Sequence, residues 1–442
     1  MTANTRKSTQ RSRLIDGMLA AANRDGYAGA NVSGVIAHAG VSRPTFYDYF
    51  ANKDECFLAV HEELARNLLD RLAPTIAAAP PERALQSAIT ALVEYAVTEP
   101  ERARFLLNET LAGGPRALDA RDRAIEEIET LVERRFAGAR PSAPAPDLPT
   151  RVVIGGVQWL LAPRLRRGDY DSAAFLAGAI DWIESCNRPA GEHRWHTLEP
   201  GPQPPASLYV SELPSSAPPS LPPGRTRLTR EEIARNQRER IMFATATLAT
   251  RKGFSATTIA DITKTARVDR RVFYVHFRDK QQAFLAAHEL GFQQAMAVSA
   301  GAYFSEREWP DRLWQGILAG IQFSATHPTL AHVGYVESHA VGTPAVQRFE
   351  DIRQSFTIFL QEGSQHRNLP RARMIMDAIA AAIAEVGYEE IRAGRVRQLP
   401  RLAYHAAYLC LAPFLGAEAA SEYLDAKLSE GKPPPTRRRT LV

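Results

Sequence analysis

Two stretches of the sequence decide the fold: Ala39-Gly-Val-Ser-Arg-Pro-Thr-Phe-Tyr-Asp-Tyr-Phe-Ala-Asn-Lys53 and Ala266-Arg-Val-Asp-Arg-Arg-Val-Phe-Tyr-Val-His-Phe-Arg-Asp-Lys280. They lie 227 residues apart in one chain of 442 residues. When residues 11–62 are placed over residues 238–289 without a gap, seventeen of the fifty-two positions are identical. A repeat with so long a period indicates two domains in tandem rather than a solenoid.

The repeat continues beyond these two stretches. Pro100-x8-Glu109 recurs as Pro328-x8-Glu337, and Leu165-Arg-Arg-Gly168 aligns with Ile391-Arg-Ala-Gly394. The offset changes by only one residue in either direction, so the second half duplicates the whole first half. Positive charge gathers in the repeated segments: residues 1–53 carry a net charge of +4 and residues 225–280 a net charge of +8, within a total of +5. Localised positive charge of this kind is typical of phosphate-binding surfaces.

Three helices are predicted around the first quoted stretch. A first helix over residues 11–23 has an apolar face and ends at Gly26, where glycine tolerates the conformation that follows a helix. A second helix spans residues 32–39 behind an N-cap at Asn31. After the turn at Gly40, a third helix begins behind the N-cap Ser42 and runs to about residue 50. Two short helices joined by a tight turn that contains glycine form a helix-turn-helix.

The third helix divides into two faces. Phe46 and Phe50 are four residues apart and face the core, whereas Arg43 and Tyr47 share a different face that can reach DNA. The second copy repeats this division, with Phe273 and Phe277 inward, Arg270 and Tyr274 outward and Asp269 as the cap. Arginine suits guanine edges, and a tyrosine hydroxyl or a lysine suits phosphate oxygens. The ordered pattern, present twice, predicts two DNA-binding helix-turn-helix units, which we call readers.

Both stretches resemble the signature of TetR-family transcriptional regulators, most specifically in the run Phe-Tyr-x-His/Tyr-Phe-x-x-Lys. The resemblance implies an all-α fold of two tandem TetR-like modules, each with a three-helix helix-turn-helix DNA-binding domain and a larger helical effector and dimerisation domain. It also implies that Tyr47 and Lys53 contact phosphates, that Arg43 and Thr45 lie near bases, and that the matching positions of copy two act likewise. The predicted DNA-contacting residues are Asn31, Ser42, Arg43, Thr45, Tyr47, Tyr49, Lys53, Thr258, Arg270, Arg271, Tyr274, His276 and Lys280.

Three departures from this pattern bear on whether both readers work. Gly34 inside the second helix costs about 1 kcal/mol relative to alanine, and Asp48 places an acid on the first recognition helix. Arg267 replaces the turn glycine Gly40, which costs roughly 1–2 kcal/mol if the position is left-handed. We expect both readers to bind DNA. The alternative is that one reader is degenerate, and the reader of copy one is then the stronger candidate for the degenerate one.

The larger domain of each copy is expected to hold an effector pocket. Candidate lining residues are aromatic, with a recurrent glutamate that either orients a ligand or caps a neighbouring helix. The predicted effector-site residues are Phe105, Glu109, Trp159, Phe323, Tyr335 and Glu337, and the further aromatic candidates are Trp182 and Phe356. Helices over residues 152–165, 172–184, 374–392 and 399–414 would end the two copies. The resemblance to the TetR family implies that they form a four-helix interface, either within one chain as a pseudo-dimer or between two chains.

The expected domain boundaries follow from the repeat and from composition. Residues 189–226, between the two copies, contain ten prolines in thirty-eight residues. This composition predicts a semi-rigid, extended linker. Another Pro-rich segment, 140–149, reads as a loop. The expected divisions are 1–55 for the first DNA-binding domain, 56–188 for the first effector domain, 189–226 for the linker, 227–282 for the second DNA-binding domain, 283–430 for the second effector domain and 431–442 for a disordered basic tail.

Several function classes are disfavoured by the sequence. The cysteines are odd in number and far apart, which favours packed thiols over disulfides, metal ligation or redox sensing. No apolar run is long enough for a membrane span, and the polar segment 1–13 is not followed by a signal core, so we expect a cytoplasmic protein without a membrane partner. No nucleotide-binding, metalloprotease or serine-hydrolase motif is present. We therefore expect no enzyme activity, no cofactor and no metal.

The sequence thus predicts a ligand-responsive DNA-binding regulator, most simply a repressor, which binds double-stranded DNA at an imperfect palindrome and is released by a small-molecule effector. An activator is the other possibility, because the sequence does not encode where the binding site lies relative to a promoter. The alternatives are a TetR-like protein with one degenerate reader and a helical interaction or ligand-binding module that does not bind DNA.

Overall fold

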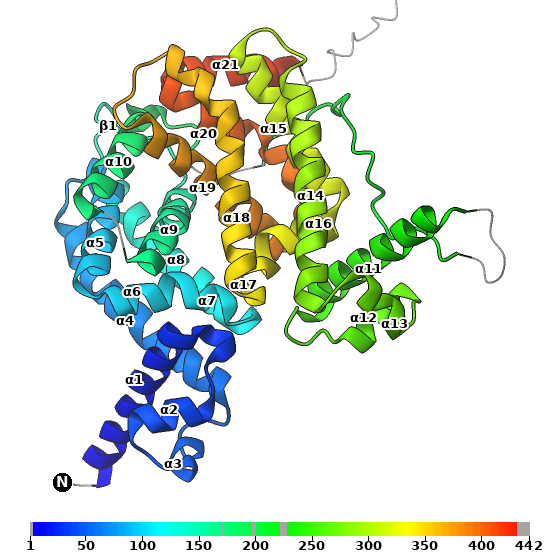
Figure 1. Cartoon of the computed structure of the whole chain (residues 1–442). Helices are drawn as coiled ribbons and strands as arrows, with labels where there is room; N and C mark the ends of the chain where they lie inside the picture. Colours follow the sequence, from blue (N-terminus) through cyan, green and yellow to red (C-terminus); the bar gives the residue numbers. More distant parts are fainter. Residues whose placement is uncertain (1–2, 169–170, 197–199, 222–227, 431–442) are drawn as a thin grey trace, which may run out of the picture.

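The computed structural model describes residues 3–168, 171–196, 200–221 and 228–430. These residues are almost entirely helical, which confirms the predicted all-α class (Figure 1). The expected basic tail, 431–442, and parts of the expected linker, 197–199 and 222–226, lie outside the described residues, as does residue 227 at the start of the second expected DNA-binding domain. Among the described helices, none combines the length and the apolar content that a bilayer crossing requires.

The first copy consists of a small N-terminal three-helix unit followed by a larger bundle. Its helices are α1 (Ala3–Gly29), α2 (Val32–Ala39), α3 (Arg43–Tyr47), α4 (Lys53–Ala78), α5 (Ala84–Thr98), α6 (Pro100–Arg104), α7 (Thr110–Ala112), α8 (Pro115–Phe136), α9 (Thr150–Arg167) and α10 (Ser172–Glu184), with a 3₁₀ turn η1 (Pro81–Arg83) and a π-helical turn η2 (Phe105–Glu109).

The second copy repeats this order after the linker. Its helices are α11 (Arg230–Lys252), α12 (Ile259–Ala266), α13 (Arg270–His276), α14 (Lys280–Tyr303), α15 (Trp309–Thr326), α16 (Pro328–His332), α17 (Ser338–Val341), α18 (Thr343–Ser355), α19 (Ala372–Arg392), α20 (Ala403–Leu415) and α21 (Ala417–Glu430), with the π-helical turn η4 (Val333–Glu337) and the 3₁₀ segments η5 (Phe356–Gln365) and η6 (Val396–Leu402).

Local sequence explains where the helices of the first three-helix unit begin and end. Gly26 interrupts α1 with φ 71°, at the position where the sequence predicts the end of the first helix. Asn31 caps α2 by accepting a hydrogen bond from the Gly34 N–H. Ser42 caps α3 by accepting from the Thr45 N–H, and Pro44 occupies the first turn, where a missing N–H costs little.

Two segments predicted to be irregular contain regular structure. Inside the Pro-rich loop, β1 (Pro144–Pro146) pairs antiparallel with β2 (Asn187–Pro189), at the start of the expected linker. A 3₁₀ turn, η3 (Ala190–Glu192), follows, and the Trp195 side chain is buried against Tyr408 of the second copy. The proline content did not predict this small sheet. A proline lacks an N–H group, but its carbonyl can still pair across the strands, and neighbouring residues supply the N–H donors.

The remaining described linker residues lie along the second copy. The Ser207 N–H donates to Gln322 of α15, and His327 Nε2 donates to the Leu213 carbonyl at 2.8 Å. Residues 200–221 have no regular secondary structure, as expected of a Pro-rich segment. Residues 200–221 of the linker therefore lie against the second copy.

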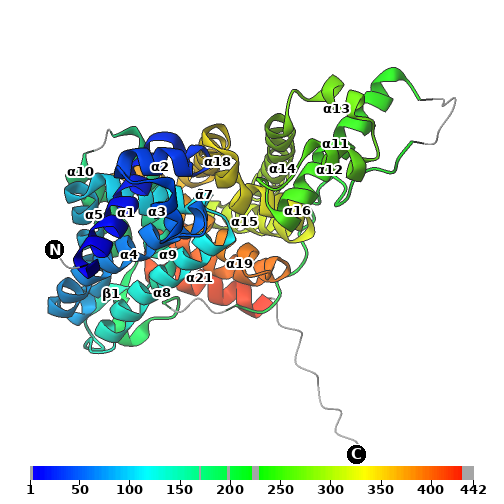
Figure 2. The ribbon, with the colours of Figure 1, turned by 90° about the horizontal axis from the view of Figure 1, so that it is seen from below.

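The two copies contact each other through α9 and α19, with α10 also packed on α19. One apolar cluster runs from the first three-helix unit through both larger bundles, and a second cluster joins α11–α13 to α14–α16. In Figure 1 the three-helix unit α1–α3 projects below the joined bundles and the unit α11–α13 projects to one side. Figure 2 shows α11–α13 extending away from the rest of the molecule. This arrangement leaves α3 and α13 at the outside of the molecule.

Candidate DNA-binding surfaces and effector cavity

The first recognition helix has the two faces that the sequence predicts. Phe46 is fully buried, and the Tyr47 side chain is 50% exposed. Arg43 is exposed, and its guanidinium donates to the Ser33 hydroxyl of α2 at 2.8 Å. This contact holds the arginine beside the preceding helix while leaving further N–H donors for a ligand.

The second recognition helix repeats the exposure pattern. Phe273 is fully buried, Tyr274 is 47% exposed, and Arg270 and Arg271 are exposed. The Arg270 guanidinium lies over the Tyr274 ring, 5.8 Å from its centroid. The exposed Val275 takes the place of Asp48, so this helix presents no carboxylate at that position.

Several predicted DNA-contacting residues form hydrogen bonds inside their own reader. Tyr49 donates to the Gln10 side chain, and His276 lies 3.2 Å from the equivalent Gln237, so both tie the recognition helix to the first helix. Thr258 forms a reciprocal capping box with Asp261 at the start of α12. These contacts fix the orientation of the readers, and contacts of the same residues with DNA remain predictions.

The two lysines that end the repeated signature bind carbonyl groups in this structure. Lys53 Nζ donates to the carbonyls of Tyr27 and Ala30 at 2.9 and 3.2 Å. Lys280 Nζ donates to three carbonyls of the segment 254–257. Partial burial lowers the pKa of both ammonium groups. Each lysine thus binds the backbone of the loop that follows the first helix. A phosphate contact by the same ammonium group would have to share its N–H donors with these carbonyls.

The turn of the second helix-turn-helix is left-handed at a non-glycine residue. Gly40 has φ 60° and ψ 42°, and Arg267 has φ 50° and ψ 50°. Arg267 therefore has the left-handed backbone for which a residue other than glycine carries an energetic cost. Its carbonyl accepts from the Arg240 guanidinium, as the Gly40 carbonyl accepts from Arg13.

A half-buried glutamate joins each reader to its larger domain. In copy one, Glu109 accepts a hydrogen bond from the Tyr27 N–H at 2.8 Å; in copy two, Glu337 accepts one from the Phe254 N–H at 2.9 Å. Burial raises the pKa of Glu109. Each carboxylate stands at the last residue of a π-helical turn and satisfies the backbone that follows the first reader helix. Of the two roles that the sequence left open, the contacts are those of a helix-end cap, and we call each contact a latch.

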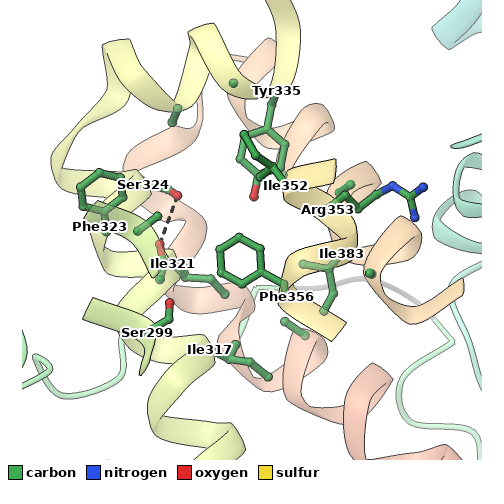
Figure 3. A pocket seen from close by; sticks show the side chains of 18 of the residues that line it. Ser299, Ile317, Ile321, Phe323, Ser324, Tyr335, Ile352, Arg353, Phe356 and Ile383 are labelled. Carbon is green, nitrogen blue, oxygen red and sulfur yellow. Dashed lines mark hydrogen bonds between the residues drawn. The ribbon is translucent and has the colours of Figure 1, made fainter. Parts of the chain in front are cut away.

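A cavity of about 210 Å³ lies in the larger domain of copy two (Figure 3). Its wall comes from α14, α15, α16, η4, α18, η5, α19, η6 and α20 and is mainly aliphatic and aromatic. The predicted residues Phe323, Tyr335 and Phe356 line it, and the Tyr335 hydroxyl points inward. Ser324 donates to the Gly320 carbonyl, and the Arg353 guanidinium extends away from the cavity.

No charged group of the described wall points into this space. Arg353 donates to the Asp377 carbonyl, and burial holds the pKa of His288 at about 4, so the imidazole is neutral near pH 7. Burial also raises the pKa of the Tyr335 phenol and keeps it protonated. The cavity therefore favours a neutral, mainly apolar molecule with a group that hydrogen-bonds to a phenol.

Copy one has large side chains where copy two has small wall residues. At offset 227, the wall residues Gly291, Ala295 and Ser299 correspond to leucines, and at offset 228 so do Gly320 and Gly334. All five leucines are buried in copy one: Leu64, Leu68, Leu72, Leu92 and Leu106. The space that forms the cavity of copy two is thus occupied by leucine side chains in copy one, and the sequence repeat contained this signal.

The other predicted effector residues do not lie in this cavity. Phe105 is fully buried and packs on Phe57, 4.6 Å between ring centroids, and Trp182 is a buried core residue. Trp159 and Glu109 border a second cavity of about 150 Å³ between the copies. Phe349 and Arg353 border both cavities, so α18 is a wall shared between them.

The three cysteines, Cys56, Cys186 and Cys410, are free and buried, as predicted. Burial raises the pKa of each thiol, to about 12 for Cys56. Thiols of this kind are packed side chains rather than reactive groups.

Two helix-turn-helix units with exposed arginine and tyrosine on their recognition helices, each latched to a larger helical bundle, define a DNA-binding transcriptional regulator. Both units match the family described as "Bacterial regulatory proteins, tetR family", over residues 14–60 and 241–287. The two matches, one in each copy, support a TetR-family regulator with two modules in tandem.

One curated protein and two solved structures are similar to parts of the chain. The chain is 26% identical over 163 residues to the HTH-type transcriptional repressor SCO4008 of Streptomyces coelicolor, a match that covers 36% of this chain and 81% of that protein. A solved tetR-family regulatory protein from Rhodococcus RHA1 is 22% identical, with a TM-score of 0.33, over 44% of this chain and 96% of its own. A putative TetR-family transcriptional regulator from Syntrophomonas wolfei is 21% identical, with a TM-score of 0.31, over 45% and 93%.

Proposed function

We propose that this chain is a ligand-responsive repressor whose two readers bind the two halves of one imperfect palindromic operator. The observation that carries the proposal is the duplicated recognition surface, with Arg43 and Tyr47 exposed on α3 and Arg270 and Tyr274 exposed on α13. Arginine can pair with guanine through two hydrogen bonds, and tyrosine can contact phosphates or bases.

The two half-sites should differ in sequence. Thr45 and Asp48 of the first reader correspond to Val272 and Val275 of the second. A carboxylate can accept from a cytosine amine, whereas valine can only make apolar contacts, for example with a thymine methyl group. The second reader also carries more positive charge, so it contributes more of the phosphate affinity.

The effector binds in the cavity of copy two. An apolar wall, a neutral histidine and an inward phenol support a neutral, mainly apolar ligand that accepts from or donates to Tyr335. Because copy one has leucines in the equivalent places, one ligand binds per chain.

Ligand binding alters the readers through the latch that shares a π-helical turn with the cavity wall. Tyr335 lines the cavity, and Glu337, two residues later, holds the Phe254 N–H of the second reader. A ligand that binds better when this turn is displaced will shift the population towards chains in which the second reader is released.

A second set of contacts leads to the first reader. Glu350 of α18, next to the cavity residue Phe349, forms an ion pair with Arg166 of copy one. Arg166 also donates to Asn108, the neighbour of the latch residue Glu109. Displacement of α18 by a ligand can therefore bias both latches.

The test is selection of bound duplexes from a random pool by the purified full-length chain, followed by salt titration. Matched double variants, Arg43→Ala/Tyr47→Ala and Arg270→Ala/Tyr274→Ala, each remove one reader and leave the buried Phe46 or Phe273 in place. We expect an imperfect palindrome, with each variant losing preference in a different half. Selection of no sequence, or of one half-site that only one double variant affects, would refute the two-reader function.

A further inference from the structure

The central contact between the copies joins residues that are equivalent in the repeat. A Cβ built on Gly156 of α9 would lie 3.5 Å from the Cβ of Ala382 of α19, and Trp159 Nε1 donates to the Glu385 carboxylate at 2.6 Å. Both pairs are separated by 226 residues, the offset that relates the two copies here. In a two-fold pairing, only residues on the axis contact their own equivalents. The halves therefore meet about a pseudo-two-fold axis that passes between α9 and α19.

A fully buried ion pair lies at this axis. Arg121 of α8 is 3% exposed and Glu385 is 0% exposed. The Arg121 guanidinium donates to both carboxylate oxygens, at 3.2 and 2.8 Å, and to the Gln158 side chain at 3.0 Å. Its central carbon also lies 4.7 Å from the centroid of the Tyr388 ring. Every charge in this cluster is thus compensated across the two copies.

The pseudo-symmetric counterpart of this ion pair is an aromatic pair. At offset 228, Arg121 corresponds to Phe349, and at offset 226, Glu385 corresponds to Trp159. The rings of Trp159 and Phe349 pack 5.3 Å apart, centroid to centroid. One side of the axis is therefore ionic and the other aromatic, although the backbone arrangement is repeated.

We infer that this core makes the two halves mutually selective, so that the α9 face accepts an α19 face and rejects a second α9 face. Pairing of two first copies would place Arg121 against Trp159 of the other chain, with no carboxylate in reach. Pairing of two second copies would bring two Glu385 carboxylates together at the axis, each facing Phe349. A buried charge without a partner is strongly destabilising, whereas the compensated pair is tolerated. Selectivity arises from rejection of the wrong partner as much as from attraction to the right one.

Peripheral ion pairs favour the same unlike pairing. Arg392 of copy two binds Asp119 and Asp122 of copy one, and Arg151 of copy one binds Glu389 of copy two. These groups are more exposed than the central pair, so each contributes less. The inference does not depend on the proposed effector, because it concerns only which faces associate.

Disulfide mapping in the full-length chain tests the inference. The distance of 3.5 Å between the Cβ positions of residues 156 and 382 suits a disulfide. Under oxidation, Gly156→Cys/Ala382→Cys should give peptides linked 156–382. Ala382→Cys alone should give no covalent dimer, and a high yield of 382–382 dimers from it would overturn the inference without any need for refolding.

A second experiment separates the effect of the buried charges from the effect of the linker that holds the two copies in one chain. A protease site placed at the exposed residues Leu208–Val210 allows the folded double-cysteine chain to be cut, unfolded in urea and refolded by dilution. With Arg121 and Glu385 present, unlike links should exceed like links roughly a hundred-fold, as expected for rejection of uncompensated buried charge.

The matched control for this experiment is the neutral double variant Arg121→Met/Glu385→Gln. The amide oxygen of the introduced glutamine can still accept the hydrogen bond from Trp159, so the variant removes both charges and keeps this contact. Like links should then appear in a yield comparable to that of unlike links. A neutral control as selective as the parent would show that the charges do not choose the partner.

Discussion

Replacement of Ala295 by leucine should fill the effector cavity with the side chain that copy one carries at the equivalent position. Ala295 lies on α14 and lines the cavity, and its counterpart Leu68 is 7% exposed. The change adds three carbon atoms, each worth about 0.8 kcal/mol when buried, so the upper limit is about 2.4 kcal/mol. A cavity needs roughly 10–15 Å³ to hold one water, so 210 Å³ leaves room for the side chain. Allowing for repacking cost, we expect a gain of about 1–2 kcal/mol.

The same substitution should abolish the ligand response without changing DNA binding in the absence of ligand. Binding of N-phenyl-1-naphthylamine, a neutral apolar fluorophore, measures access to the cavity, and urea unfolding measures stability. Ala297→Leu is the matched control, because Ala297 is exposed on the same helix. Ala295→Leu should weaken fluorophore binding at least about tenfold, since a filled site excludes the ligand. Unchanged fluorophore binding in Ala295→Leu, or equal losses in both variants, would refute the assignment of the cavity.

Three further predictions concern the latch, the turn and pH. Glu337→Ala removes the acceptor of the Phe254 N–H, which costs about 1–3 kcal/mol; hydrogen exchange at Phe254 should accelerate, and an unchanged rate would argue against the latch. Arg267→Gly relieves a left-handed residue and should raise the melting temperature of the second reader through a net gain of about 0.5–1 kcal/mol, so a lower melting temperature would contradict the strain. Burial holds the pKa of His288 at about 4 and that of His339 at about 3, below the unfolded value of about 6.5. The unfolded chain therefore binds more protons below pH 6.5, and the free energy of unfolding, measured in urea, should fall by roughly 2 kcal/mol per histidine between pH 7 and pH 5; His288→Asn should reduce this fall, and an equally steep fall in that variant would exclude His288.

The sequence predicted the readers in detail because their signals are local. The predicted second helix, 32–39, and the helix 172–184 have the predicted bounds, and Gly26 ends the regular part of α1. Caps, glycines and the spacing of apolar residues act over a few residues, so no tertiary information is needed to interpret them. The third helix is shorter than predicted: α3 ends at Tyr47 instead of near residue 50.

The cavity and the pairing surface depend on residues that meet only after folding. Phe105 and Trp182 were plausible lining residues by type, yet both are buried in the core, because an aromatic residue gives no indication of whether it faces a space or a neighbour. The comparison that would have located the cavity is glycine, alanine or serine in one copy against leucine in the other. Arg121 and Glu385 were missed because they are 264 residues apart and occupy positions that differ between the copies.

The linker and the Pro-rich loop show a different limit. Proline content predicts the absence of long helices, and residues 200–221 conform to it. It does not predict that β1 and β2 pair, or that Trp195 is buried against the second copy, because both depend on the two modules being in contact.

Native mass spectrometry at low micromolar concentration can measure the mass of the complex between the full-length chain and the selected operator, and so the number of chains on each duplex. We expect one chain per duplex, with both half-sites protected, because the two readers belong to one polypeptide. Two chains per duplex, each contributing a single type of reader, would contradict it.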